Sequence, residues 1–222
     1  MALCAISLSV MRVRVFPKEK RALLELAAFR EPAYTLFTIG MFFAFMGLYI
    51  PIFYIQTYAI QEKIMDTNLA FYMLPILNAA SIFGRVVPNF FADKIGPLNM
   101  LIPCAFAAAV LAFGWIGIKS TPGLIIFAIL YGFFSGAFVS LPPTALVGLS
   151  PHMRVIGTRM GMSFAISALG LLVGTPVSGA ILESTGRFLG PQLLAGSTIL
   201  VAAACIVASR LYKVGPKLTV KA

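Results

Sequence analysis

Six apolar stretches constrain the fold of this chain more than any other feature of its sequence. They cover residues 33–56, 69–91, 98–118, 124–147, 156–182 and 193–211. A helix needs about 20 apolar residues to cross the hydrocarbon core of a bilayer, and each stretch is near or above that length. The stretches are continuous and do not alternate apolar with polar residues, so a transmembrane β-barrel is not expected. The sequence therefore predicts an all-α integral membrane protein with six transmembrane helices.

The distribution of charge predicts the orientation of these helices. Only 11% of the residues are charged, against about 25% in soluble proteins. Thirteen of the 17 basic residues lie in alternate loops and in the two tails, whereas three lie on the opposite side, at Lys63, Lys119 and Arg187. This asymmetry is typical of cytoplasmic loops. We expect a multi-pass protein of the plasma membrane with both termini in the cytoplasm. The net charge of +10 is thus explained without nucleic acid as a partner.

Three regions follow from this pattern. Residues 1–32 are a cytoplasmic basic segment that begins with the end of a preceding helix, residues 33–212 form the six-helix transmembrane domain, and residues 213–222 are a cytoplasmic basic tail. The apolar start, residues 1–11, is too short to span a membrane. Residues 12–32 fit either a short amphipathic helix on the membrane surface or a solvated linker.

The sequence does not favour an enzyme. Membrane hydrolases and transferases use paired carboxylates, a Ser-His couple or a metal cluster within the spans. The predicted hydrophobic cores contain no acidic residue, and His152 lies in a loop. The three cysteines, Cys4, Cys104 and Cys205, are isolated. We therefore expect no catalytic residues, no metal site and no cofactor.

One arginine lies inside a predicted helix. Arg85 keeps its charge in a protein, so it must find water, a partner or a ligand. At about 100° per residue, Asn78, Ser81, Arg85 and Asn89 share one face of the helix within about 80°. Lipid contact with such a stripe would be costly, so we expect it to face the bundle interior or an aqueous cavity. A structural role for Arg85, and helix–helix hydrogen bonds for Asn78 and Ser81, are the alternatives.

Two groups of motifs carry a family resemblance. The sequence Gly84-Arg85, followed after seven residues by Asp93-Lys94-Ile95-Gly96, resembles the major facilitator motif in the cytoplasmic loop after the second helix of each half. The fungal monocarboxylate-porter-like branch of the major facilitator superfamily (MFS) is similar at Pro142-Pro143, at residues 156–162 and at residues 174–179. The chain from about Arg12 onward resembles the carboxy-terminal half of such a transporter, which would make its spans helices 7–12.

The resemblance implies a transporter with a rocker-switch cycle, moving a small organic anion such as a monocarboxylate or a carboxylated metabolite, with or without protons. Arg85 matches the arginine that pairs with the substrate carboxylate in animal monocarboxylate carriers. Ser81 stands where those carriers have an aspartate that helps to couple the proton. Asn78 and Tyr49 are further candidates for substrate binding.

The same resemblance implies a conformational latch. In the family's pattern, Asp93 docks on the positive end of a helix in the opposite half, and Gly84 and Gly96 allow close helix approach. Lys94 completes the motif. Arg159 is expected to anchor the membrane edge or to serve in this latch.

Three functional interpretations stay open at the level of sequence. The first is a half-length carrier of a small organic anion, working in the bilayer alone or with a second six-helix half. The second is a truncated or relic half that does not transport by itself. The third is an exporter of a fungal secondary metabolite.

Overall fold

The structure is a computed structural model that describes residues 24–215. The six spans are α2 (Pro32–Gln61), α3 with α4 (Thr67–Phe71 and Met73–Ile95), α5 (Pro97–Gly114) with η2 (Trp115–Gly117), α6 (Thr121–Ser140) with α7 (Pro142–Leu149), α8 (Ile156–Thr185) and α9 (Leu189–Val214). The prediction of an all-α protein with six membrane-spanning helices is confirmed. The expected helix at residues 1–11 lies outside the described residues.

Two of the spans are interrupted. The second is divided at Tyr72, between α3 and α4, and the fourth at Leu141, between α6 and α7. The break in the fourth span has a clear cause. Pro142 and Pro143 directly follow Leu141 and have no backbone N–H to continue the hydrogen bonds of α6.

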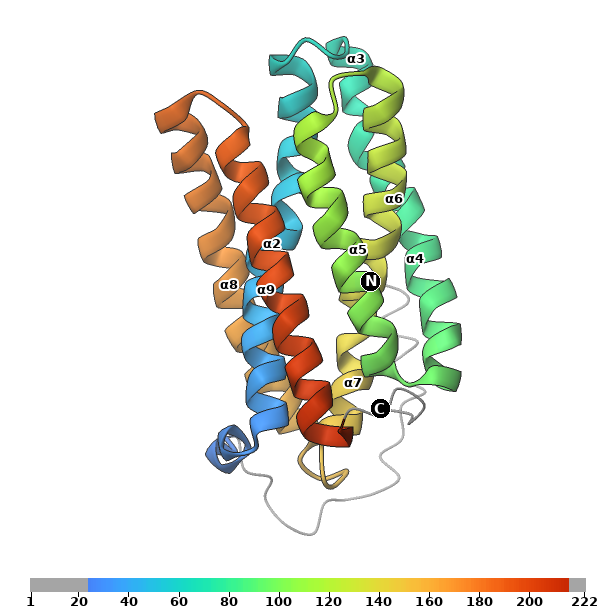
Figure 1. The fold of residues 1–222 in the computed structure, drawn as a ribbon, viewed down its shortest axis with the longest axis vertical. Helices are drawn as coiled ribbons and strands as arrows, with labels where there is room; N and C mark the ends of the chain where they lie inside the picture. The colour runs from blue at the N-terminus through green and yellow to red at the C-terminus, as the bar shows by residue number, and fades with distance from the viewer. Residues whose placement is uncertain (1–23, 216–222) are drawn as a thin grey trace, which may run out of the picture.

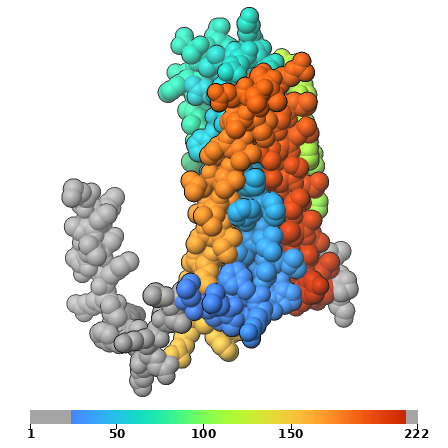
Figure 2. Space-filling model, turned by 90° about the vertical axis from the view of Figure 1, so that its left-hand side faces the viewer, coloured from blue at the N-terminus to red at the C-terminus, as the bar shows by residue number. Residues whose placement is uncertain are grey.

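The spans run side by side, with α4 and α8 at the two edges of the bundle (Figure 1). Between them, α2 packs against α8 and α9, α5 against α9 and α6, and α6 against α4. The end of the bundle that carries η1 (Leu26–Arg30), α7 and the last turn of α9 is here called the inner end, because the charge pattern predicts that it faces the cytoplasm. The space-filling view shows α8, α2 and α9 together on one face of the molecule, with the first described residues at its lower end (Figure 2).

Glycines bring the helices of two pairs into backbone contact. In the α2–α8 pair, a Cβ atom added at Gly170 would overlap the carbonyl oxygen of Phe42. In the α4–α6 pair, a Cβ at Gly84 would overlap the carbonyl oxygen of Phe133, and one at Gly132 that of Leu77. Small residues allow such approach between membrane helices, where packing rather than the hydrophobic effect drives association.

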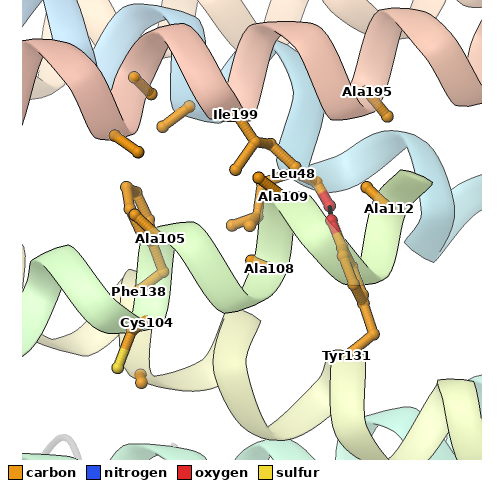
Figure 3. Packing of buried hydrophobic residues seen from close by; sticks show 14 of the residues in the cluster. Leu48, Cys104, Ala105, Ala108, Ala109, Ala112, Tyr131, Phe138, Ala195 and Ile199 are labelled. Atoms are coloured by element: carbon orange, nitrogen blue, oxygen red, sulfur yellow. Dashed lines mark hydrogen bonds between the residues drawn. The ribbon is translucent and has the colours of Figure 1, made fainter. Parts of the chain in front are cut away.

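A row of alanines packs α5 against its neighbours (Figure 3). Four of them, Ala105, Ala108, Ala109 and Ala112, are at most 1% exposed. In the same core, the hydroxyl of Tyr131 on α6 donates a hydrogen bond to the carbonyl of Leu48 on α2 at 2.8 Å. Leu48 lies three residues before Pro51, inside α2, where proline removes one helical hydrogen bond. The bond from Tyr131 therefore ties two helices together beside this weakened turn.

Candidate functional site

The predicted polar stripe lies on α4, between a packed face and an open face. The packed face meets α6 and includes the buried residues Leu77, Ser81, Gly84 and Pro88. Arg85 and Asn78 are exposed. The next turns place Ile82, Phe83 and Val86 outward, each more than 60% exposed. Arg85 therefore lies outside the contact with α6, beside an apolar surface.

The structure joins three members of this stripe by local hydrogen bonds. The hydroxyl of Ser81 donates to the carbonyl of Asn78 at 2.8 Å. The side-chain amide of Asn89 donates to the carbonyl of Arg85 and, at 2.9 Å, to the hydroxyl of Ser140 on α6. Ser81, 8% exposed, also packs against Gly136 of α6. Ser81 and Asn89 thus serve the contact with α6, whereas Asn78 and Arg85 face away from it.

Arg85 has no ion pair within the part of the chain that the structure describes, and its guanidinium makes no hydrogen bond there. It lies ten residues before Ile95, the last residue of α4, which is about 15 Å along the helix axis. The charge is therefore close to the middle of a hydrocarbon core about 30 Å thick. A guanidinium at this depth presents paired donors that fit a carboxylate.

Tyr49 lies on α2, apart from this stripe. Its ring is half-buried and contacts Phe45 and Phe53 of the same helix, with centroids 5.8 and 6.1 Å away. These contacts place Tyr49 in an aromatic column along α2. The structure does not join it to Arg85 by a hydrogen bond or ring contact.

The motif turn lies at the inner end of α4. Asp93 and Lys94 are exposed in its last turn, and the Lys94 ammonium lies 5.0 Å from the ring centre of Phe90. Gly96 links α4 to α5 with φ of 107°, a value that residues with a Cβ rarely adopt. Glycine is therefore required here, and its conformation turns the chain directly into α5.

Arg159, by contrast, is buried in a cluster of its own at the inner end of α8. Its side chain is 1% exposed and binds Glu25 and Glu31, which precede α2. The distances are 3.1 and 3.2 Å to the Glu25 carboxylate and 2.6 and 2.7 Å to that of Glu31. The ring of Tyr34 lies 5.4 Å from the guanidinium carbon, and the Tyr34 hydroxyl donates to the Arg159 carbonyl at 2.8 Å.

The position of Arg159 explains why it needs these acids. It is the fourth residue of α8, next to the positive end of the helix dipole, where a second positive charge is unfavourable. The two carboxylates compensate it, and the hydrogen bond from Arg159 holds the pKa of the Glu31 carboxyl below its ordinary value. The expectation of an anchor at the membrane edge missed this inward orientation.

The sequence offered one indirect signal for the cluster. Glu25 and Glu31 are acids in a segment that is otherwise basic. Nothing in the local pattern pairs them with an arginine more than 120 residues later. Within residues 24–215, no group of three or more His, Cys, Asp or Glu side chains is placed to hold a metal ion.

Comparison with known proteins gives the family context of this geometry. No family model matches the chain. It is 44% identical over 199 residues to the MFS-type transporter dbaD of Emericella nidulans, which covers 89% of this chain and 45% of that protein. It is 39% identical over 189 residues to the aspyridones efflux protein apdF of the same organism, covering 85% of this chain and 38% of that protein.

Solved structures support the same fold. The fucose:proton symporter FucP of E. coli superimposes with a TM-score of 0.74 at 16% identity, covering 94% of this chain and 52% of that one. The six helices therefore have the fold of one half of a major facilitator transporter. Their homologues are fungal MFS-type transporters, and the chain spans about half the length of these relatives.

Proposed function

We propose that this chain is one half of a membrane exporter for an acidic fungal secondary metabolite, with Arg85 binding the anionic group. The observation that carries the proposal is the Arg85 guanidinium, which is exposed near mid-membrane depth and has no carboxylate partner in the described chain. A charge in that position is costly unless it faces water or a ligand. The efflux activity in the name of apdF favours export over uptake.

We propose that a second six-helix half completes the site by packing against the open faces of α4 and α8. Only 28% and 22% of the residues in the most apolar windows of these two spans are buried, against 50% or more in α2, α6 and α9. Transport sites of this fold class lie near the bilayer midplane between two repeats. Asn78, exposed one turn beyond Ser81, would join Arg85 in this site, and Tyr49 would line its α2 side.

The proposed latch uses the turn at the inner end of α4. Asp93 and Lys94 are exposed there, and Gly96 turns the chain into α5. Gly84 holds α4 against α6 and so fixes the position of this turn relative to the rest of the chain. Arg159 already pairs with its own acids, so we assign it to bracing the inner end of α8 rather than to the latch.

Uptake of an organic acid into proteoliposomes tests the role of Arg85. With the full chain and labelled benzoate as probe, we expect saturable uptake that the neutral analogue benzamide does not inhibit. Arg85→Lys should weaken apparent affinity about tenfold, because the paired donors are lost. Arg85→Ala should nearly abolish uptake, whereas Arg187→Ala, which removes an exposed arginine at the outer end, should not change it.

Two results would contradict the proposal. Full benzoate uptake by Arg85→Ala would remove Arg85 from the site. Absence of saturable uptake by the unmodified chain would instead support the alternative that this half does not transport alone.

A further inference from the structure

The segment that leads into α2 turns its first acid inward and its leucines outward. This entry segment, residues 24–30, consists of η1 and the two residues before it. Leu24 and Leu26 are 65% and 71% exposed. Between them, Glu25 points into the protein, where its carboxylate accepts hydrogen bonds from Arg159 at 3.1 and 3.2 Å. A segment that faced water would be expected to expose the acid and to cover the leucines.

The rest of the protein holds the entry segment in this orientation. Ala28 is fully buried, and the ring of Phe29 lies edge-on to Tyr34, with centroids 5.6 Å apart. The hydroxyl of Thr35, in the first turn of α2, donates a hydrogen bond to the carbonyl of Phe29 at 2.8 Å. Together with the bonds from Arg159, these contacts fix one side of the segment against α2 and α8. The side that carries the two leucines therefore stays outward.

The entry segment lies at the level of the membrane boundary. Its last residue, Arg30, is separated from α2 only by Glu31, and the first apolar stretch begins at residue 33. Figure 1 shows η1 projecting sideways at the foot of α2, at the inner end of the bundle. Arg30 is exposed and forms no ion pair with any residue of the described range. The outward side of the segment thus combines two leucines with one cation.

We propose that the entry segment is an interaction surface for the lipids of the inner leaflet. Leu24 and Leu26 insert at the boundary between headgroups and acyl chains, a placement typical of apolar side chains that lie beside basic ones. Arg30 extends from this apolar surface toward the phosphates. The pairing with Arg159 withdraws Glu25, whose charge would be costly to dehydrate in the interface. The surface is independent of the transport site proposed on α4, and it favours the membrane-surface alternative over a solvated linker.

Tryptophan quenching in nanodiscs tests this placement. The only tryptophan of the chain, Trp115, is fully buried, so Trp115→Phe gives a background without tryptophan. In this background, Leu26→Trp reports on the entry segment, and Met153→Trp reports on the α7–α8 loop, where Met153 is 87% exposed. Lipids brominated near the headgroup end of their acyl chains should quench Leu26→Trp about threefold more than Met153→Trp. Iodide, a quencher dissolved in water, should show the opposite order.

A further substitution tests whether the ion pair orients the segment. Glu25→Ala, combined with Leu26→Trp, removes the carboxylate that Arg159 holds, and we expect quenching by the brominated lipids to fall about twofold. Glu183→Ala removes an exposed acid near the outer end of α8 and is the matched control, which should leave the quenching unchanged. Equal quenching in the Glu25→Ala variant and its parent would overturn the orienting role of the pair.

Two other results would overturn the membrane contact itself. Iodide quenching of Leu26→Trp as strong as that of Met153→Trp would show that the entry segment faces water. Protection of Leu26→Trp from both quenchers would show that protein covers the leucines instead of lipid. If Trp115→Phe does not fold, the two reporters are compared in the otherwise unmodified chain after subtraction of the Trp115 emission, with the same expected and contradicting results.

Discussion

The middle of α4 and the inner end of α8 each contain one arginine, and the two differ in burial and in carboxylate partners. Arg159 is 1% exposed and lies between two glutamates and a tyrosine ring. Arg85 is exposed and has no carboxylate partner in the described chain. The difference teaches that a charge within an apolar helix is not by itself a functional signal. What distinguishes the two residues is whether another part of the described chain already neutralises the charge.

The largest expected difference concerns stability. Arg159→Gln leaves two carboxylates at the inner end without their cation, and we expect the free energy of unfolding to fall by about 3 kcal/mol. This value is at the lower end for buried pairs, because the Glu31 side chain is 46% exposed. Arg85→Gln should change it by less than about 0.5 kcal/mol, as for other exposed positions. Denaturant titration in mixed micelles measures the free energy of unfolding of both variants. Similar losses in Arg159→Gln and Arg85→Gln would contradict the proposed difference between the two arginines.

A smaller effect is expected where the helix pairs touch through glycine. Gly84→Ala should destabilise the α4–α6 contact by about 1–3 kcal/mol, since the new methyl group overlaps the Phe133 carbonyl. Gly161→Ala on α8 is the matched control, because a Cβ there meets nothing within 4 Å. The control should be neutral or slightly stabilising, as alanine favours helix over glycine. Thermal midpoints of the two variants test this difference, and equal losses would show that overlap with the Phe133 carbonyl is not the cause.

The smallest effect concerns acid pH. Because the Arg159 hydrogen bond lowers the pKa of Glu31, this pair stabilises the folded chain fully above the ordinary glutamate pKa of 4.5. The stabilisation is lost as the pH falls through the lower, folded value. We therefore expect amide hydrogen exchange in residues 24–31 to become faster below about pH 4. In Glu31→Gln, exchange should already be faster at neutral pH. A Glu31→Gln profile identical to that of the unmodified chain would show that the pair does not hold this segment.

Sequence reasoning reached the fold but only part of the site. Six long apolar runs specify six membrane helices, and Pro142 with Pro143 specify the break after α6. The helical period placed Asn78, Ser81, Arg85 and Asn89 on one side of α4, but it does not reveal which flank a neighbouring helix covers. Ser81 and Asn89 turned out to contact α6.

The Arg159 cluster was beyond local pattern reasoning. Its acids lie before α2, and the pairing exists only because α2 and α8 are neighbours in space. Hydrophobic periodicity and composition describe only one or two turns of a helix. This cluster instead depends on which helices pack against each other. To the predicted role of Arg159 as a membrane-edge anchor or part of the latch, the structure adds that its side chain is buried against two glutamates.

The alanine row on α5 has a consequence for how this chain tolerates mutation. In most protein interiors, truncation of a large side chain leaves a cavity, and the damage grows with the volume removed. Ala105, Ala108, Ala109 and Ala112 have almost nothing to remove, so enlargement is the damaging change at these four positions. In a deep mutational scan, substitution of these four alanines by larger side chains should therefore be deleterious even where the new residue is hydrophobic.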